Sequence, residues 1–245
     1  HMSTYDGDIG RLRSGFVEFL HNLPFYGLAV VCSDDPGVQK IMGSIGRAIV
    51  TYGLDEEADL RAGNIEFDAG MTRFDVIRGG DRPALQITLR LPGLHNVRNA
   101  LAAIAVAEEL QIPDAAVVKA LENFEGIDRR FQSLGEVRTA AGEILLIDDY
   151  GHHPTEVEAT LAAARTGWPD RRIVLVFQPH RYTRTRDLMD DFAQVLSEAD
   201  VLVLLDVYAA GEAPIAGADG RAIARAVRSR GAVEPVFVES LDELQ

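Results

Sequence analysis

The segment 148–153 concentrates groups suited to acid–base or anion-binding chemistry: two carboxylates, a phenol and two imidazoles. It begins at the last residue of an apolar run, 143–148, and this run predicts a buried strand. Polar and titratable side chains gathered at a strand end indicate a ligand site. The alternative is that Asp148 or Asp149 caps the next helix and that His153 only packs. A metal site at the two neighbouring histidines is disfavoured, because adjacent side chains of an extended segment point apart.

A second polar segment, 178–184, follows the next apolar run, 172–177, and carries His180, Arg181 and Arg184. Several guanidinium groups beside a strand end predict a pocket for phosphate or carboxylate. They would also stabilise the charge that develops on a transferred phosphoryl group. The alternative is a solvated basic surface.

A third feature is the pair Asn96 and Asn99, three residues apart at the start of a predicted helix and therefore on one face of it. Their amides can pair with an adenine edge, which needs a donor and an acceptor. The alternative is that Asn96 is a helix N-cap and Asn99 is only solvated. Arg129 and Arg130, in a hinge-like segment, could reach the same crevice from the side.

The pattern of predicted helices and strands differs between the two halves of the chain. This difference predicts two domains, 1–125 and 126–245. The first half combines helices with a β-rich stretch that is divided by turn residues. Its predicted helices cover 16–23, 95–110 and 113–121, and its predicted strands cover 27–32, 48–52, 60–67, 73–77 and 85–91.

The second half alternates strands and helices in strict order. This order predicts parallel βαβ units with right-handed crossovers, and hence an α/β, doubly wound, Rossmann-like sheet. Ligands of such sheets lie at the carboxyl ends of the strands, so the two polar loops should face one crevice. The predicted strands are 143–148, 172–177, 201–207 and 236–238, and the helices are 154–165, 187–198 and 219–230.

Composition narrows the function. A formal net charge of −14 disfavours duplex nucleic acid and anionic membranes as partners. Cys32 is the only cysteine, so neither an internal disulfide nor a thiolate metal cluster can form within one chain, as is typical of the cytoplasm. No apolar stretch approaches the roughly 20 residues of a membrane span. The oligomeric state is left open, a homo-oligomer included.

Four motifs occur in order along the chain, and together they resemble the Mur ligase family. Any one of them would be a weak signal, whereas the ordered set is specific. They are Gly93-Leu-His-Asn-Val-Arg-Asn99, Gly126-Ile-Asp-Arg-Arg-Phe131, Asp148-Asp-Tyr-Gly-His-His-Pro-Thr-Glu156 and Phe177-Gln-Pro-His-Arg-Tyr-Thr-Arg-Thr185.

The resemblance implies a partial central ATPase domain over 1–125 and a C-terminal Rossmann-like ligase domain over 126–245, truncated at its C-terminal end. The family's N-terminal UDP-binding domain is missing, as is a G-x-x-x-x-G-K-[ST] phosphate loop. We therefore expect that γ-phosphate binding is not encoded here and that this fragment alone is inactive.

The resemblance also implies roles for individual residues. Asn96 and Asn99 would bind the adenine of ATP, and Arg130 and Asp149 would reach its ribose and phosphates. His1 corresponds to a histidine that the family uses on Mg²⁺, although His-Met is also a common cloning remnant.

The muramate carboxylate and the alanine would lie against Tyr150, His152, His180, Arg181 and Arg184. Among all these positions, we expect the catalytic residues to be Arg130, Asp149, His152 and Arg184.

The implied reaction is the ATP- and Mg²⁺-dependent ligation of L-alanine to UDP-N-acetylmuramate, through an acyl phosphate, in cytoplasmic peptidoglycan precursor synthesis. One alternative is a ligase of murein recycling that attaches a preformed peptide to the same sugar nucleotide. Another is a non-catalytic two-domain remnant or binding module. A Rossmann oxidoreductase has little support, since no G-x-G-x-x-G follows a predicted strand.

Overall fold

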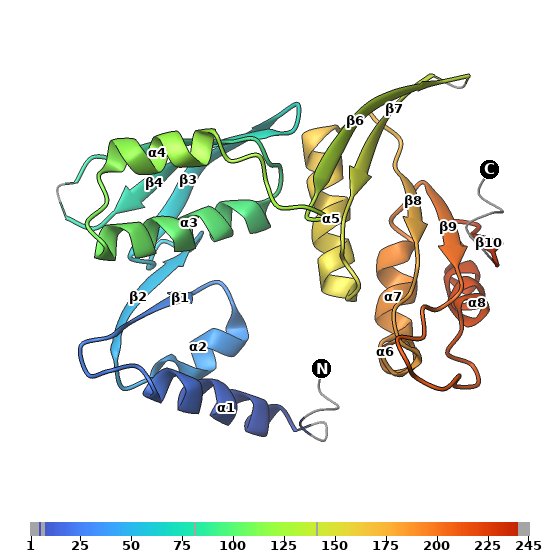
Figure 1. The fold of residues 1–245 in the computed structure, drawn as a ribbon, viewed down its shortest axis with the longest axis horizontal. Coiled ribbons are helices and arrows are strands. Elements are labelled where there is room, and N and C mark those ends of the chain that lie inside the picture. The colour runs from blue at the N-terminus through green and yellow to red at the C-terminus, as the bar shows by residue number, and fades with distance from the viewer. Residues whose placement is uncertain (1–4, 6–7, 81, 141, 240–245) are drawn as a thin grey trace. The chain divides into compact units, whose positions relative to one another are not determined.

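The computed structural model describes residues 5, 8–80, 82–140 and 142–239 (Figure 1). The chain divides into two compact units, His1–Glu125 (unit 1) and Gly126–Gln245 (unit 2). Each unit contains its own cluster of buried apolar side chains. Among the described residues, no helix combines the length and apolarity that crossing a bilayer requires.

Unit 1 is built on a five-stranded sheet of order β1-β2-β3-β4-β5. The first three strands are parallel, and the last two continue the sheet as antiparallel neighbours. The β-rich stretch predicted from the sequence is therefore confirmed. The strands are β1 (Leu28–Cys32), β2 (Ala48–Gly53), β3 (Leu60–Asp68), β4 (Met71–Arg78) and β5 (Leu85–Leu89).

The helices of unit 1 are α1 (Ile9–His21), α2 (Pro36–Met42), α3 (Leu94–Glu109) and α4 (Asp114–Glu122). Helix α3 buries Val97, Leu101 and Ile104, whose spacing forms one helical face, against apolar residues of the sheet. Helix α2 was not predicted, because it has little apolar periodicity. It begins at Asp35, whose side chain accepts hydrogen bonds from the first free N–H groups, and Pro36 occupies the first turn.

A partly buried carboxylate links three elements of unit 1. Asp34, after β1, accepts hydrogen bonds from the backbone N–H of Leu54 at 2.8 Å and from Arg98 Nε of α3 at 2.5 Å. Burial alone would raise the pKa of Asp34, but Arg98 and the backbone donors lower it below its usual value. The carboxylate therefore fixes α3, the helix that carries Asn96 and Asn99, to the ends of β1 and β2.

In unit 2, the strands β8 (Val174–Phe177), β9 (Val201–Leu205) and β10 (Val236–Val238) form a parallel sheet of order β10-β9-β8. The core forms where these strands meet α5 (Pro154–Gly167), α7 (Met189–Leu196) and α8 (Gly220–Arg230). The alternation of strand and helix predicted for this half is confirmed. The largest buried side chains of this core include Phe192, Leu196, Leu202, Leu204 and Ile223.

Residues 143–148 were predicted to form a buried strand of the parallel sheet, and this prediction is wrong. β7 (Gly142–Asp148) pairs instead with β6 (Gln132–Thr139), antiparallel, in a separate two-stranded sheet. Because only one neighbour strand covers it, Ile144 and Leu146 remain nearly half exposed. Strand β6 was not predicted, since it contains few apolar residues.

The segment after β8 also differs from the prediction. Tyr182–Asp187 forms a short helix, α6, and Leu188 interrupts the chain before α7 begins at Met189. A loop followed by one continuous helix from 187 to 198 was expected. The difference matters for the site, because Arg184 lies on a helix rather than on a free loop.

The link at Asp34 predicts the effect of a small substitution. A Cβ at Gly53 would lie 2.3 Å from Asp34 Oδ1 and 2.8 Å from Ser33 Oγ, so Gly53→Ala must displace the carboxylate. We expect Gly53→Ala to lower the free energy of unfolding of unit 1 by about 1–3 kcal/mol, the usual cost of overpacking. Urea unfolding, followed through NMR resonances of unit 1, measures it.

Gly43→Ala is the matched control, because a Cβ there meets nothing within 4 Å. It should leave unit 1 as stable as before or slightly more stable. Equal stability of the two variants would show that Asp34 does not constrain this corner.

Candidate functional site

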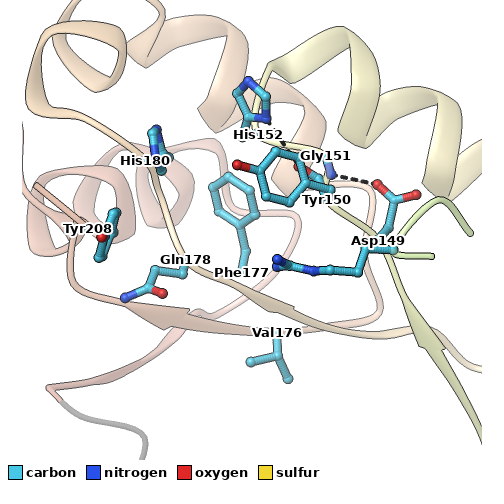
Figure 2. A pocket seen from close by; sticks show the side chains of 10 residues that line it. Asp149, Tyr150, Gly151, His152, Val176, Phe177, Gln178, His180 and Tyr208 are labelled. Atoms are coloured by element: carbon cyan, nitrogen blue, oxygen red, sulfur yellow. Dashed lines mark hydrogen bonds between the residues drawn. The ribbon is translucent and has the colours of Figure 1, made fainter. Parts of the chain in front are cut away.

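A pocket of about 470 Å³ opens in unit 2, where the segments that follow β7, β8 and β9 meet (Figure 2). Asp149 and Tyr208 lie at opposite ends of it in this view, with Tyr150 and His180 between them. The two polar loops singled out in the sequence therefore contribute to one cavity. The pocket is lined by Arg129, Asp149, Tyr150, Gly151, His152, Val176, Phe177, Gln178, His180 and Tyr208.

Four rings form a row along this pocket. The centroid of Tyr150 lies 5.4 Å from that of His152, which lies 5.8 Å from that of His180. His180 in turn stacks against Tyr208, with centroids 5.4 Å apart and planes inclined by 28°. The row joins residues of three separate loops, and its imidazoles offer hydrogen-bond donors to an anionic ligand.

Asp149 orders the loop after β7. Its Oδ2 accepts a hydrogen bond from the Phe131 N–H at 2.8 Å, and its Oδ1 accepts one from the Gly151 N–H at 2.7 Å. The Tyr150 N–H donates to the Arg129 carbonyl at 2.7 Å. The carboxylate therefore ties the segment before β6 to the loop that carries Tyr150, in addition to lining the pocket.

The sequence left open whether Asp148 or Asp149 caps α5, and neither does. The N-cap is His153, and a capping box joins it to Glu156. Glu156 Oε2 accepts hydrogen bonds from the N–H groups of His152 at 2.9 Å and His153 at 3.1 Å. Burial opposes ionisation of Glu156, but these bonds, His152 and Arg130 lower its pKa. His153 thus has a structural role, but as the N-cap of α5 and not only as a packing residue.

Arg184 lies in α6 and is buried, at 9% exposure. Its Nη1 is 3.0 Å from the His180 carbonyl and 3.3 Å from His180 Nδ1. Burial and the nearby Arg181 lower the pKa of Arg184. Neither Arg181 nor Arg184 lines the pocket itself. Arg184 instead supports His180, which does line it.

His180 is held in its neutral form. Burial lowers its pKa first, and the charge of Arg184 lowers it further, followed by His152 and Arg181. Arginine can only donate hydrogen bonds, so the contact with Arg184 requires Nδ1 of His180 to be the acceptor. The single proton of the neutral ring is then on Nε2.

The two arginines before β6 differ in their surroundings. Arg130 Nη1 lies 3.8 Å from Glu156 Oε1, and its guanidinium is 5.9 Å from the Tyr150 ring centroid. The Arg129 guanidinium lies closer to that ring, at 4.7 Å, and Arg129 also lines the pocket. Both arginines were expected to reach the crevice, but only Arg130 was given a role in ATP binding and catalysis, whereas Arg129 is the one that lines the pocket.

Two more lining residues, Gln178 and Tyr208, were also missed. Tyr208 belongs to the segment 206–212, which directly follows β9. The rule that ligands lie at the carboxyl ends of parallel strands would have found this segment too, had it been applied to the third strand as it was to the first two.

Asn96 and Asn99 belong to unit 1, in the first turns of α3. The N-cap of α3 is Gly93, so the alternative that Asn96 is the cap is wrong. The side-chain amide of Asn96 donates to the Pro92 carbonyl at 2.8 Å, which fixes the side chain, and Asn99 is exposed. A shared adenine site with unit 2 stays a prediction.

Among residues 5, 8–80, 82–140 and 142–239, no group of three or more His, Cys, Asp or Glu side chains is placed to hold a metal ion. His1, the residue expected on Mg²⁺, lies outside the described residues.

Comparison with known proteins gives two domain matches. Residues 1–107 match the Mur ligase middle domain, and residues 129–245 match the Mur ligase, glutamate ligase domain.

Solved structures agree with these matches. UDP-N-acetylmuramate-alanine ligase MurC from Thermotoga maritima is 31% identical, with a TM-score of 0.76 over 100% of this chain and 50% of that one. A murein peptide ligase from Psychrobacter arcticus is 24% identical, with a TM-score of 0.65 over 96% of this chain and 48% of that one. MurF from Acinetobacter baumannii is 21% identical, with a TM-score of 0.66 over 93% of this chain and 46% of that one. This chain thus spans about half the length of these relatives. Because the models of both domains match in order along the sequence, the chain belongs to the Mur ligase family.

Proposed function

We propose that this chain supplies the middle and C-terminal domains of an ATP-dependent ligase that joins L-alanine to UDP-N-acetylmuramate in the cytoplasm. The observation that carries the proposal is the pocket of unit 2, where Tyr150, His152 and His180 lie together with arginines on two sides. Identity of 31% to an enzyme described as a UDP-N-acetylmuramate-alanine ligase supports this substrate pair.

The proposed reaction has two steps. The muramate carboxylate attacks the γ-phosphorus of ATP, which gives an acyl phosphate and releases ADP. The alanine amine then attacks the acyl carbon, and the tetrahedral intermediate collapses to the amide with loss of phosphate and a proton. Both steps place negative charge on oxygen, so they need positive charge and hydrogen-bond donors that are already in place.

The pocket meets that need through its own side chains. His180, neutral with its proton on Nε2, is a hydrogen-bond donor to a carboxylate or phosphoryl oxygen. Arg184 stands behind it as a fixed positive charge, and Arg129 brings a second guanidinium to the other end of the pocket. The ring of Tyr150 keeps Arg129 in place through a cation–π contact.

The nucleotide is assigned by family resemblance. Asn96 and Asn99 would hold the adenine, and Arg130 and Asp149 would meet the ribose and phosphates. MurF from Thermotoga maritima, 15% identical with a TM-score of 0.60, was solved in complex with ADP. Both oxygens of Asp149 already accept backbone N–H groups, so Asp149 would act mainly by ordering its loop. When bound with ATP, Mg²⁺ would neutralise charge on the phosphate oxygens.

The substrate assignment predicts a preference among amines. The enzyme that contains this chain should release ADP with UDP-N-acetylmuramate and L-alanine, and at least about tenfold more slowly with a tripeptide in place of alanine. A coupled assay of ADP release measures both rates. Faster release with the tripeptide would identify a murein peptide ligase instead, and no release with either would refute ligation of this sugar nucleotide.

The support that Arg184 gives to the pocket predicts a loss of turnover. In the same enzyme, Arg184→Ala should reduce kcat by roughly 10²-fold, the order of effect that a 1 Å misplacement of a group in the site can have, because His180 loses the side chain that orients it. Circular dichroism should show that the fold persists.

Arg186→Ala is the matched control from the same helix, because Arg186 is exposed and pairs with its neighbour Asp187 at 2.8 Å. It should retain the parent kcat. If Arg184→Ala also retained it, Arg184 would have no part in the reaction.

A further inference from the structure

The segment 206–212 forms a wall of the pocket to which the proposed function assigns no role. It begins directly after β9, and its Tyr208 lines the cavity. Figure 2 shows Tyr208 beside His180, on the side away from Tyr150. Its contacts with the loop after β8 are numerous, and they fall on the residues that surround Arg184.

The first set of contacts is between backbones. The Arg181 N–H donates to the Tyr208 carbonyl at 2.9 Å, and the Tyr208 N–H donates to the Pro179 carbonyl at 2.8 Å. His180 and Tyr208 form an isolated parallel bridge beyond the ends of β8 and β9. The chain on both sides of His180 is therefore fixed to Tyr208.

A side chain adds a second connection. Glu212 Oε2 accepts a hydrogen bond from the Thr183 N–H at 3.0 Å, and Oε1 accepts one from the Thr183 hydroxyl at 2.7 Å. These bonds lower the pKa of Glu212, so it is ionised at neutral pH. Thr183 immediately precedes Arg184, and so Glu212 anchors the start of α6 on which Arg184 lies.

The segment held between these contacts has an unfavourable backbone conformation. Arg181 has φ 71° and ψ 133°, a region that residues with a side chain rarely adopt. Such a conformation persists only where the surroundings over-determine it, and it occurs most often at functional sites. The bonds to Tyr208 and Glu212, on either side of Arg181, provide that constraint.

The ring of Tyr208 also orients the imidazole of His180. It stacks on His180, while Arg184 Nη1 contacts Nδ1 of the same imidazole, so His180 is held by two side chains from different segments. Tyr208 is 57% exposed, and no hydrogen bond of its hydroxyl is needed for this contact.

We infer that the segment 206–212 is a positioning element of the ligation site, in which Tyr208 sets the plane of the His180 ring and Glu212 sets the place of Arg184. Tyr208 and Glu212 are positioning residues, because they act through His180 and Arg184. The contacts of Tyr208 and Glu212 are observed in the structure, whereas the role of this segment in ligation rests on the proposed function.

The test is an NMR titration of His180 in the 245-residue chain, with its resonance assigned through His180→Gln. Tyr208→Leu removes the stacked ring, so the ring-proton resonances of His180 should lose their ring-current shift. Its pKa should rise toward the ordinary value, because the phenol no longer shields it from water. Tyr208→Phe keeps the ring and should restore both signatures.

Glu212→Gln weakens the acceptor that holds Thr183, so Arg184 should be displaced from His180. The ¹⁵N chemical shift of His180 Nδ1 should then move away from the value that the contact with Arg184 gives it. Tyr26→Leu, an exposed tyrosine of unit 1, is the control and should change neither signature. An unchanged His180 in folded Tyr208→Leu, or in Glu212→Gln should the first variant not fold, would overturn the inference.

Steady-state kinetics distinguish a failure of this inference from a failure of the proposed function. In the full enzyme, Tyr208→Leu should lower kcat for alanine ligation at least tenfold and leave the KM for ATP unchanged. Parent-like kcat would overturn the positioning role. If the parent enzyme ligated no alanine, the proposed function would fail, while the NMR result would still decide whether 206–212 positions His180.

Discussion

The hydrogen bonds from Arg184 to His180 are the interaction on which the site in unit 2 depends. A buried guanidinium is costly unless its donors are satisfied, so α6 and the loop before it must fold in a way that brings His180 to Arg184. The same contact assigns the proton of His180 to Nε2 and opposes a second protonation. One interaction thus sets the position, the tautomer and the charge of an imidazole in the pocket.

The surrounding charges act at short range within a chain that is acidic as a whole. The formal net charge is −14, yet Arg129, Arg130, Arg181 and Arg184 all lie near the loops after β7 and β8. Glu156 and Glu212 accept backbone N–H groups, so they order the loops and offset part of this positive charge. Asp148 and Asp149 lie beside these arginines as well, so the positive charges around the pocket are matched by nearby carboxylates rather than left in excess.

The sequence predicted the elements whose apolar residues follow a clear period. Strands β8 and β9 are nearly continuous apolar runs, and α3 repeats its buried residues at helical spacing. All three elements were therefore predicted. Strand β6 and helix α6 were missed because their stability comes from partners rather than from pattern. β6 depends on pairing with β7, and α6 depends on Glu212 and the buried Arg184.

The site was predicted to a similar degree. Density of polar residues at strand ends located Asp149, Tyr150, His152 and His180, all of which line one pocket. The sequence favoured Arg130, whereas Arg129 is the arginine that lines the pocket, because the contacts of a guanidinium depend on the folded backbone and not on sequence position. The sequence also could not show that Arg184 contacts His180 from outside the pocket, because this contact depends on how the chain turns into α6.

The most direct test of this account is the tautomer of His180, read from the imidazole ¹⁵N chemical shifts of the labelled chain at neutral pH. We predict a neutral ring with its proton on Nε2 and with Nδ1 accepting from Arg184. A ring with its proton on Nδ1, or one that is protonated on both nitrogens at neutral pH, would contradict the account.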